Sequence, residues 1–417
     1  MKHENFEQFD VVIVGGGAAG LMAAISAARA GAKTVILEHK EKTGKKILST
    51  GNGKCNYTNE HQGISYYRGE NPDFVVPVFE QFGFTETVAF FEEIGVSPKV
   101  KNGYYYPASE QAAAVLEVLR LETNYLRVKE VCDCEIREVK RDVEGFFLST
   151  SAGLFAGKSL IFATGLLAAP KSGSDGSAFP YIEKFGHHFI DVVPALVPLQ
   201  GKQAFFRQLA GIRAEIQAIL YVENEKIASE YGELQLTDYG VSGIPIFQLS
   251  RYATKSLKKG KKVHIMLDFL PHLTEDETVQ LFEKRLHKAE QKKTVCECFV
   301  GLFNKKLAEV LLREAGISLG DSPKKIDLTQ IQRLASLAKE LRVDITGSKS
   351  FEQAQVCAGG VDTNEINPDT MESKLVKGLY FAGELVDIDG MCGGYNLQWA
   401  WSSGYVAGLH AAKRGQK

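Results

Sequence analysis

Uninterrupted runs of apolar residues predict short buried strands near both ends of the chain. Residues 11–14 (VVIV) and 34–37 (TVIL) show no polar alternation, as expected for parallel strands buried on both faces. Residues 160–165 (LIFATG) and 378–384 (GLYFAGE) have the same character and end in small residues, which let a backbone approach a flat ligand closely. Ala19 to Ala30 is rich in alanine and predicts a helix between the first two strands.

The middle of the chain changes from a strand-like to a helix-like pattern. Strands are predicted between Pro194 and about Phe269, in EIQAILYVEN, KIASEYGELQLTD and KVHIMLDFL. From Thr274 to about Glu314 apolar residues recur at helical spacing, and Thr274 followed by Glu277 predicts a capping box. Residues 328–341 predict another amphipathic helix, and LRVDITG after it predicts a strand.

This order of elements predicts an α/β protein with a discontinuous first domain. Residues 1–193 and 358–417 are expected to form a Rossmann-like domain, since the C-terminal strand completes its sheet. Residues 194–270 and 341–357 are expected to form a β-rich insertion domain. Residues 271–340 are expected to form a small helical domain.

Three glycines and one acid around the first strand predict a dinucleotide site. Gly15, Gly17 and Gly20 lie between the strand and the helix, and Glu38 ends the second strand. Such glycines provide a tight turn, close approach to a pyrophosphate and close packing of helix on strand, while the acid accepts hydrogen bonds from ribose hydroxyls. The helix N-terminus adds free N–H groups for the pyrophosphate.

The loop from Gly44 to Asn59 (GKKILSTGNGKCNYTN) follows the acidic strand end and extends this site. It is rich in glycine, asparagine and small hydroxyl residues and carries Lys45, Lys46 and Lys54. Its backbone N–H groups can surround phosphates and a polar ring system. The alternative interpretation is a solvated turn region.

Composition excludes several classes of function. The chain has 417 residues, a net charge of −2 and 44% hydrophobic residues, which is typical of a soluble protein without general attraction for nucleic acid. No apolar run reaches the roughly 18 to 20 residues of a membrane span, and the polar N-terminal run MKHENFEQ is neither a signal nor a transit peptide. The seven scattered cysteines favour a reducing cytoplasm. The oligomeric state is left open.

The chain resembles the HI0933-like family of bacterial FAD-binding oxidoreductases, which includes enzymes described as aminoacetone oxidases and bile-acid reductases. The motifs that carry the resemblance are GGGAAG with Glu38, LSTGNGKCNYTN, IFATG, LTDYGVSG at 236–243, and GLYFAGELVDIDGMCGGYNLQWAWSSGYVAG at 378–408. The resemblance implies an FAD domain of the glutathione-reductase type, so the cofactor expected at the glycine turn is FAD rather than a nicotinamide. Lys54, Cys392 and the stretch LLAAPKSGSDGSAF depart from the family pattern, so substrate identity does not follow from it.

The resemblance also implies which residues contact FAD. Glu384 is expected at the ribityl chain, with Asp387 as a second candidate, and the helix that opens at residues 392–396 (CGGYN) is expected to stabilise negative charge on the reduced flavin. The complete expected set is Gly15, Gly17, Ala18, Ala19, Gly20, Glu38, His39, Lys45, Lys46, Ser49, Thr50, Gly51, Asn52, Cys55, Asn56, Ile136, Ala163, Thr164, Gly165, Gly383, Glu384, Asp387, Gly393, Gly394, Tyr395 and Asn396.

The cysteines and glycines elsewhere argue against two further sites. Only Cys55 follows the first FAD motif, and the other close pairs are CxC without histidine clusters, so neither a redox disulfide nor a metal site is expected. No second GxGxxG lies in a strand–helix context after Glu38, so NADH or NADPH, as electron donor, is expected to bind only transiently.

Catalytic side chains are weakly indicated. Tyr239, Tyr395, Asn396 and the cluster Tyr104 to Tyr106 are candidates for a proton donor. His187 and His188 are expected in a surface turn. The predicted function is two-electron chemistry at FAD on a small or steroid-sized molecule, with NAD(P)H as reductant. The alternatives are an amine or ketone oxidase that uses dioxygen, and a flavin-binding sensor without turnover.

Overall fold

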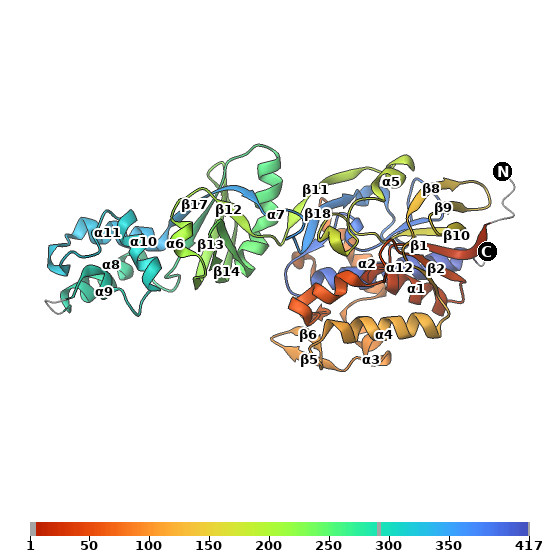
Figure 1. Cartoon of the computed structure of the whole chain (residues 1–417), viewed down its shortest axis with the longest axis horizontal. Helices are drawn as coiled ribbons and strands as arrows, with labels where there is room; N and C mark the ends of the chain where they lie inside the picture. The colour runs from red at the N-terminus through yellow and green to blue at the C-terminus, as the bar shows by residue number, and fades with distance from the viewer. Residues whose placement is uncertain (1–5, 290–292, 416–417) are drawn as a thin grey trace. The chain divides into compact units, whose positions relative to one another are not determined.

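The computed structural model describes residues 6–289 and 293–415, which form two compact units (Figure 1). Unit 1 comprises Met1–Val193 and Gln355–Lys417, and unit 2 comprises Pro194–Ala354. The N-terminal run MKHENFEQ, in which no targeting signal is expected, lies mostly outside the described residues.

Seven strands form the central sheet of unit 1. Their spatial order is β7 (Lys129–Val131), β2 (Thr34–Leu37), β1 (Glu7–Val14), β10 (Gly153–Phe162), β9 (Phe146–Thr150) and β8 (Ile136–Arg141), with β19 (Leu379–Phe381) paired to β10. Strands β7, β2, β1, β10 and β19 pair in parallel, and β9 pairs antiparallel with β10 and β8. This sheet confirms the predicted α/β class with a Rossmann-like domain.

The parallel strands end at one edge of the sheet because they run in the same direction. Val11 to Val14 and Val35 to Leu37 are buried, as their unbroken apolar pattern predicts. Gly15 follows β1, Glu38 follows β2, and Ala163 follows β10. The short strand β19 is followed at the same edge by Gly383.

Helices α1 (Ala18–Arg29) and α12 (Tyr395–Gly415) come from opposite ends of the sequence and lie side by side against the sheet (Figure 1). Their close approach depends on two glycines of α12. A Cβ atom on Gly404 would lie 2.4 Å from the carbonyl oxygen of Ala19, and one on Gly408 would lie 2.2 Å from that of Ala23. The last helix is therefore part of the core around the first βα unit.

The remaining elements of unit 1 surround this core. They are the short sheets β3 (Thr58–Asn59), β6 (Tyr104–Pro107), β5 (Pro98–Lys101); β20 (Asp389–Gly390), β4 (Tyr67–Arg68); and β11 (Phe189–Ala195), β18 (Val356–Val361); the α-helices α2 (Val75–Gln81), α3 (Phe84–Glu93), α4 (Ala112–Tyr125) and α5 (Phe179–Lys184); and the 3₁₀ helices η1 (Lys45–Gly53), η2 (Ile64–Tyr66), η3 (Pro72–Phe74), η4 (Pro170–Ser172), η6 (Thr363–Glu365) and η7 (Gly383–Leu385).

Unit 2 is a closed barrel with helices. The barrel strands are β12 (Leu199–Gly201), β15 (Gly240–Gly243), β14 (Glu225–Leu236), β13 (Arg213–Val222), β16 (Val263–Asp268) and β17 (Leu341–Ser348), and the helices are α6 (Phe206–Leu209), α7 (Ile244–Lys258), α8 (Glu275–His287), α9 (Val295–Cys298), α10 (Lys305–Glu314), η5 (Pro323–Lys325) and α11 (Leu328–Lys339). One hydrophobic cluster extends from barrel residues such as Leu220 to helix residues such as Phe282. The expected β-rich and helical insertion domains therefore share a single core.

Three local predictions can be compared directly with the structure. The capping box is confirmed, because Thr274 Oγ1 accepts from the Glu277 N–H at 3.2 Å and Glu277 Oε2 accepts from the Thr274 N–H at 2.8 Å. The three strands predicted within 194–269 are confirmed as β13, β14 and β16, but the strand-like interpretation of the range is wrong at Ile244–Lys258, which forms α7. The surface position of His187 is also wrong, because that residue is only 2% exposed.

Candidate functional site

A cavity of about 390 Å³ lies at the edge of unit 1 where the parallel strands end. All of its lining residues belong to unit 1. Many of the residues predicted to contact a cofactor line it, namely Gly15, Gly17, Ala18, Ala19, Glu38, His39, Lys45, Lys46, Thr50, Ile136, Ala163, Thr164, Gly165, Gly383, Glu384 and Asn396.

The glycine turn after β1 gives the cavity a bare backbone wall. Gly15 has φ of 98°, and a Cβ atom there would lie 2.7 Å from the carbonyl oxygen of Ala163. A Cβ atom on Gly20 would lie 1.9 Å from the Gly15 carbonyl oxygen, so α1 packs directly on the turn. Gly17 differs, because a Cβ atom there would meet nothing within 4 Å and would extend into open space. A ligand can therefore lie against the backbone at Gly17.

At the N-terminus of α1, beside this wall, no side chain occupies the free N–H groups of the helix. Gly17 is the N-cap residue, no side chain caps the helix, and its first turn has no acidic residue. The first N–H groups of a helix carry partial positive charge and need acceptors. An anionic group such as a pyrophosphate fits this position.

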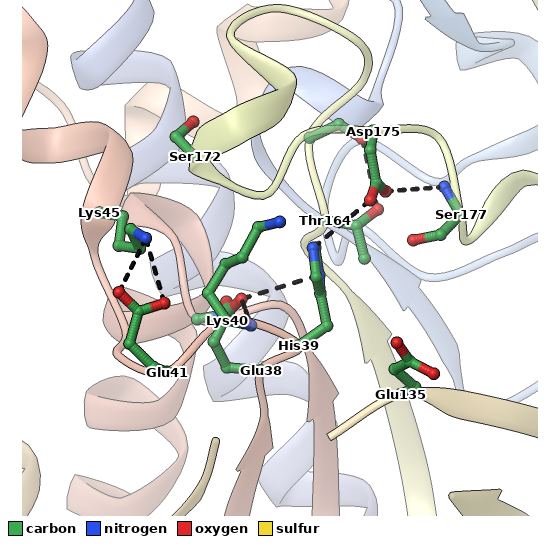
Figure 2. A network of polar contacts seen from close by, with 12 residues as sticks. Glu38, His39, Lys40, Glu41, Lys45, Glu135, Thr164, Ser172, Asp175 and Ser177 are labelled. Atoms are coloured by element: carbon green, nitrogen blue, oxygen red, sulfur yellow. Dashed lines mark hydrogen bonds and ion pairs between the residues drawn. The ribbon is translucent and has the colours of Figure 1, made fainter. Parts of the chain in front are cut away.

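Glu38 and His39 form one end of the cavity (Figure 2). Glu38 is buried, and its carboxylate accepts hydrogen bonds from the N–H groups of Gly16 at 2.7 Å and Lys40 at 2.8 Å. The Nε2 atom of His39 makes no hydrogen bond to the described residues, and it lies 3.4 Å from Oδ2 of Asp175. Because each carboxylate oxygen has a further lone pair, Glu38 can still accept from ligand hydroxyls.

A segment that the sequence did not indicate closes over this end. Ser172 to Ala178, here called the strap, line the cavity (Figure 2), apart from Gly176. A Cβ atom on Gly173 would lie 3.5 Å from His39 Cε1 and 3.6 Å from Glu38 Oε1. Burial alone would raise the pKa of Asp175, but hydrogen bonds from Ser177 and the nearby charges of His39 and Lys40 hold it below its usual value. The available signal was the glycine- and serine-rich composition after Thr164.

Lys46 and Glu384 meet in the cavity wall from distant parts of the chain. The Nζ atom of Lys46 lies 2.7 Å from Oε2 of Glu384, and both side chains are largely buried. The other carboxylate oxygen accepts from the Cys357 N–H at 2.7 Å. Glu384 is therefore held in place by groups from η1 and β18.

The first residues of α12 form another part of the wall. Asn396, Leu397 and Ala400 line the cavity, but the Asn396 amide is engaged with backbone. Its Oδ1 accepts from the Gly390 N–H and its Nδ2 donates to the Gly390 carbonyl, both at 2.8 Å. Asn396 thus fixes the entry to the helix.

The other predicted contact residues do not line the cavity, namely Gly20, Ser49, Gly51, Asn52, Cys55, Asn56, Asp387, Gly393, Gly394 and Tyr395. Asp387 is fully buried, and its Oδ2 accepts from the Glu70 N–H at 2.8 Å. Burial raises the pKa of Cys55 to about 12, so its thiol stays protonated. Asn56 is 8% exposed, and its Oδ1 has no partner among the described residues.

Tyr395 and Tyr239, two of the predicted catalytic candidates, are not among the residues that line the cavity. Tyr395 stacks on Tyr66 with ring centroids 4.6 Å apart, and burial raises its pKa above the usual value. Tyr239 belongs to unit 2, where the Nζ atom of Lys349 lies 3.6 Å from its ring centroid. Its role as a proton donor stays a prediction.

Within residues 6–289 and 293–415 no group of His, Cys, Asp and Glu side chains is arranged to hold a metal ion. All seven cysteines are free thiols. None of the helices in the described part of the chain is long and apolar enough to cross a membrane.

Together these walls fit a ligand that is anionic near one helix N-terminus and rich in hydroxyl groups beside two carboxylates. The bare backbone at Gly17 and the helix N-terminus fit a pyrophosphate, and Glu38 fits a ribose. A dinucleotide meets both of these requirements. Asn56 does not line the cavity, but its unpartnered Oδ1 also needs an N–H donor.

Curated relatives resemble nearly the whole chain. A 3-dehydro-bile acid delta(4,6)-reductase of Clostridium scindens is 42% identical over 404 residues, which are 96% of this chain and 98% of that protein. A ribosomal RNA dihydrouridine synthase of Haemophilus influenzae is 31% identical over 412 residues, which are 97% of this chain and 98% of that protein.

Solved structures share the fold at low identity. A flavocytochrome c3 fumarate reductase in its open conformation has a TM-score of 0.52 at 16% identity, covering 99% of this chain and 79% of that one. A 3-ketosteroid-delta4-(5alpha)-dehydrogenase from Rhodococcus jostii RHA1 has a TM-score of 0.51 at 15% identity, covering 99% and 98%.

The family comparison agrees with the motifs found in the sequence. The model of the HI0933-like protein Rossmann domain matches residues 9–410, which include the glycine turn, the second acid at Glu384 and the start of α12. The resemblance inferred from the sequence is therefore confirmed, and the chain belongs to the HI0933-like family.

Proposed function

We propose that this protein binds FAD in the cavity of unit 1 and reduces a carbon–carbon double bond that is conjugated to a carbonyl group in a steroid-sized molecule. The observation that carries the proposal is the single cavity that joins the glycine turn and Glu38 to Glu384 and the start of α12. A site with only the first half of this wall would suit an ordinary nicotinamide dehydrogenase equally well.

The chain's own residues divide the binding of FAD among them. Gly17 and the N-terminus of α1 would hold the pyrophosphate, and Glu38 would hold the ribose. Lys46 and Glu384 would orient the ribityl chain, and Asn56 would accept from the flavin N–H. When bound, FAD supplies hydride transfer, while the protein supplies binding, orientation and electrostatics.

The choice of reaction is supported by the names of two relatives. A delta(4,6)-reductase and a dihydrouridine synthase both add hydrogen across a double bond, and in 3-keto steroids and in uracil that bond is conjugated to a carbonyl. We favour the steroid-like class for this chain because its identity to the bile-acid reductase is higher. A net charge of −2 also gives no general attraction for RNA.

The electron donor and the compartment belong to the same proposal. We infer that NADH or NADPH reduces the flavin by transient binding and that the protein works in a reducing cytoplasm, which the free thiols support. These points separate the proposed reductase from an oxidase that uses dioxygen and from a flavin-binding sensor.

One series of measurements tests the proposal. The purified protein should show flavin absorbance, and anaerobic mixing with NADH or NADPH should bleach it. Addition of a 3-keto-4,6-diene bile acid should then restore the oxidised spectrum in a stopped-flow instrument. Rapid reoxidation only by air would favour the oxidase, reoxidation only by uridine-containing ribosomal RNA would favour the second substrate class, and no reoxidation by any acceptor would favour the sensor.

A further inference from the structure

The segment from Met391 to Gly394, just before α12, is held rigidly by unit 1. The Met391 N–H donates to the Tyr66 carbonyl at 2.9 Å, and the Asn59 side chain donates to the Gly393 carbonyl at 3.0 Å. Asn396 fixes Gly390 from the other side. The backbone of Met391 to Gly394, here called the platform, is therefore held by hydrogen bonds from other segments of unit 1.

Two aromatic rings lie near the position that a Cβ atom on Gly393 would occupy. A Cβ atom on Gly393 would lie 2.9 Å from Cε1 of Tyr104 and 3.4 Å from Cε2 of Tyr395. Tyr395 is in turn stacked on Tyr66. The backbone of Gly393 is thus in van der Waals contact with the rings of Tyr104 and Tyr395.

Strand β6 separates the three consecutive tyrosines, because alternate side chains of a strand point to opposite faces. Tyr105 packs against aromatic rings of its own face, with its ring centroid 5.1 Å from that of Phe84 and 6.2 Å from that of Tyr57. Tyr104 and Tyr106 point the other way, where Cys392 is an electrostatic neighbour of both. Only one face of the strand thus reaches the platform.

The groups at this face are proton donors. Burial raises the pKa values of Tyr104, Tyr106 and Cys392 above their usual values, so all three keep their protons at neutral pH. The Tyr104 ring is half-buried, and its hydroxyl has no hydrogen-bond partner in the part of the chain that the structure describes. That hydroxyl is available to a ligand.

The same platform adjoins the cavity. Asn396 and Leu397, which line the cavity wall, lie three and four residues after Gly393. The unpartnered Oδ1 of Asn56 would lie 3.0 Å from a Cβ atom on Gly394. An acceptor for a ring N–H and a free phenol thus flank one short backbone segment, Gly393–Gly394.

We propose that the Tyr104 hydroxyl donates a hydrogen bond to the carbonyl oxygen of the substrate, with Tyr66 and Cys392 beside the bound carbonyl. This inference rests on the proposed function. A hydride from the reduced flavin forms a C–H bond at the β-carbon. The π bond of the carbon–carbon double bond breaks at the same time, and its electron pair is delocalised onto the carbonyl oxygen. Tyr104 stabilises that charge, and the α-carbon takes a proton from water. The substrate is reduced by two electrons and the flavin is oxidised by two.

The test compares Tyr104→Phe with Tyr105→Phe in the FAD-loaded protein. The first change removes a hydroxyl from the face of β6 that carries Tyr104 and Tyr106. The second removes one from the opposite face of β6, where Tyr105 packs on Phe84 and Tyr57. Reoxidation of the reduced flavin by a 3-keto-4,6-diene bile acid should slow about 100-fold in Tyr104→Phe and change little in Tyr105→Phe. Reduction of the flavin by NAD(P)H and the Kd for FAD should be the same in both variants.

A spectroscopic measurement checks the contact itself. Difference infrared spectra of the bound steroid should show a lower carbonyl stretching frequency in the wild-type protein than in Tyr104→Phe, because a hydrogen bond weakens the C=O bond. Replacement of Tyr104 by 3-fluorotyrosine keeps the size of the ring. It should change the reoxidation rate if the hydroxyl at position 104 donates the hydrogen bond to the substrate carbonyl. Equal carbonyl frequencies and equal rates in the wild type and Tyr104→Phe would overturn this inference and leave the reductase intact. Failure of the wild type to reduce any enone would overturn the proposed function as well.

Discussion

The Nε2 atom of His39 lies 3.4 Å from Oδ2 of Asp175, and this contact joins the residue pair after β2 to the strap, both of which line the cavity (Figure 2). Both side chains are partly exposed, at 26% and 37%, so the pair is worth only about 0.2–1 kcal/mol. We expect Asp175→Asn and His39→Gln each to weaken FAD binding about two- to fivefold, measured by flavin fluorescence. His61→Gln, a change to an exposed histidine near Glu60, is the control. Unchanged FAD affinity in both variants would mean that the strap is held by other contacts.

Substitution of Gly17 tests whether the cofactor lies against the backbone of the glycine turn. Its φ of −75° is accessible to alanine, and a Cβ atom there meets no protein atom within 4 Å. Gly17→Ala should therefore leave the thermal stability of the apoprotein unchanged but weaken FAD binding at least tenfold, because the methyl group occupies space that the ligand needs. Gly320→Ala is a matched control, since a Cβ atom on Gly320 also meets nothing and that residue lies in unit 2. Tight FAD binding by Gly17→Ala would place the cofactor elsewhere.

The ion pair between Lys46 and Glu384 should stabilise unit 1 even without a ligand. Lys46→Met removes one partner and leaves a largely buried carboxylate, which should lower the free energy of unfolding by about 1–3 kcal/mol. The double variant Lys46→Met/Glu384→Gln should cost less than the sum of the single changes. Lys45→Met breaks the more exposed pair with Glu41, at 2.9 Å, and should change apoprotein stability little. Additive single effects in urea denaturation would argue against coupling.

His187 should make stability depend on pH. Burial lowers its pKa, its Nδ1 lies 3.0 Å from Glu365 Oε2, and its Nε2 lies 2.7 Å from Ser373 Oγ. Below the ordinary histidine pKa of about 6.5 the unfolded chain binds a proton that the folded chain does not. Stability should therefore fall as pH drops from about 6.5 toward the lowered pKa of the folded state.

The neighbouring His188 has the opposite sign, since its hydrogen bond to Glu365 raises its pKa, but it is exposed and screened. In a His188→Gln background the loss of stability between pH 7 and 5.5 should therefore be larger. Addition of His187→Gln should remove most of this pH dependence in urea denaturation curves. An unchanged slope would assign the pH dependence to other groups.

Local patterns were enough to predict much of unit 1. The strands at 11–14 and 34–37 and the helix between them depend on residues adjacent in sequence, as does the capping box at Thr274 in unit 2. Glycine at position 15 is required by a positive φ and a close carbonyl, so its meaning is also local. These features are therefore visible in a single sequence.

Other features depend on contacts between distant residues. Helix α7 begins at Ile244 and Pro245 after barrel strands, and its apolar positions Ile246, Leu249 and Ala253 pack into the barrel core; the surrounding strand-like runs hid this spacing. His187 becomes buried because Glu365 and Ser373, which are 178 and 186 residues away, satisfy both ring nitrogens. Tyr104 and Tyr105 have different neighbours because β6 pairs with β3 and β5. This pairing cannot be recognised from a sequence motif.

The side-by-side packing of α1 and α12 also has a consequence for biosynthesis. The cavity needs Glu38 from the first tenth of the chain and Glu384, Asn396 and Ala400 from the last tenth. Because a ribosome delivers the N-terminal part first, the nucleotide turn is made long before its opposite wall exists. With FAD in the proposed cavity, we therefore expect the cofactor to bind at the end of translation, and a chain that stops before α12 to bind none.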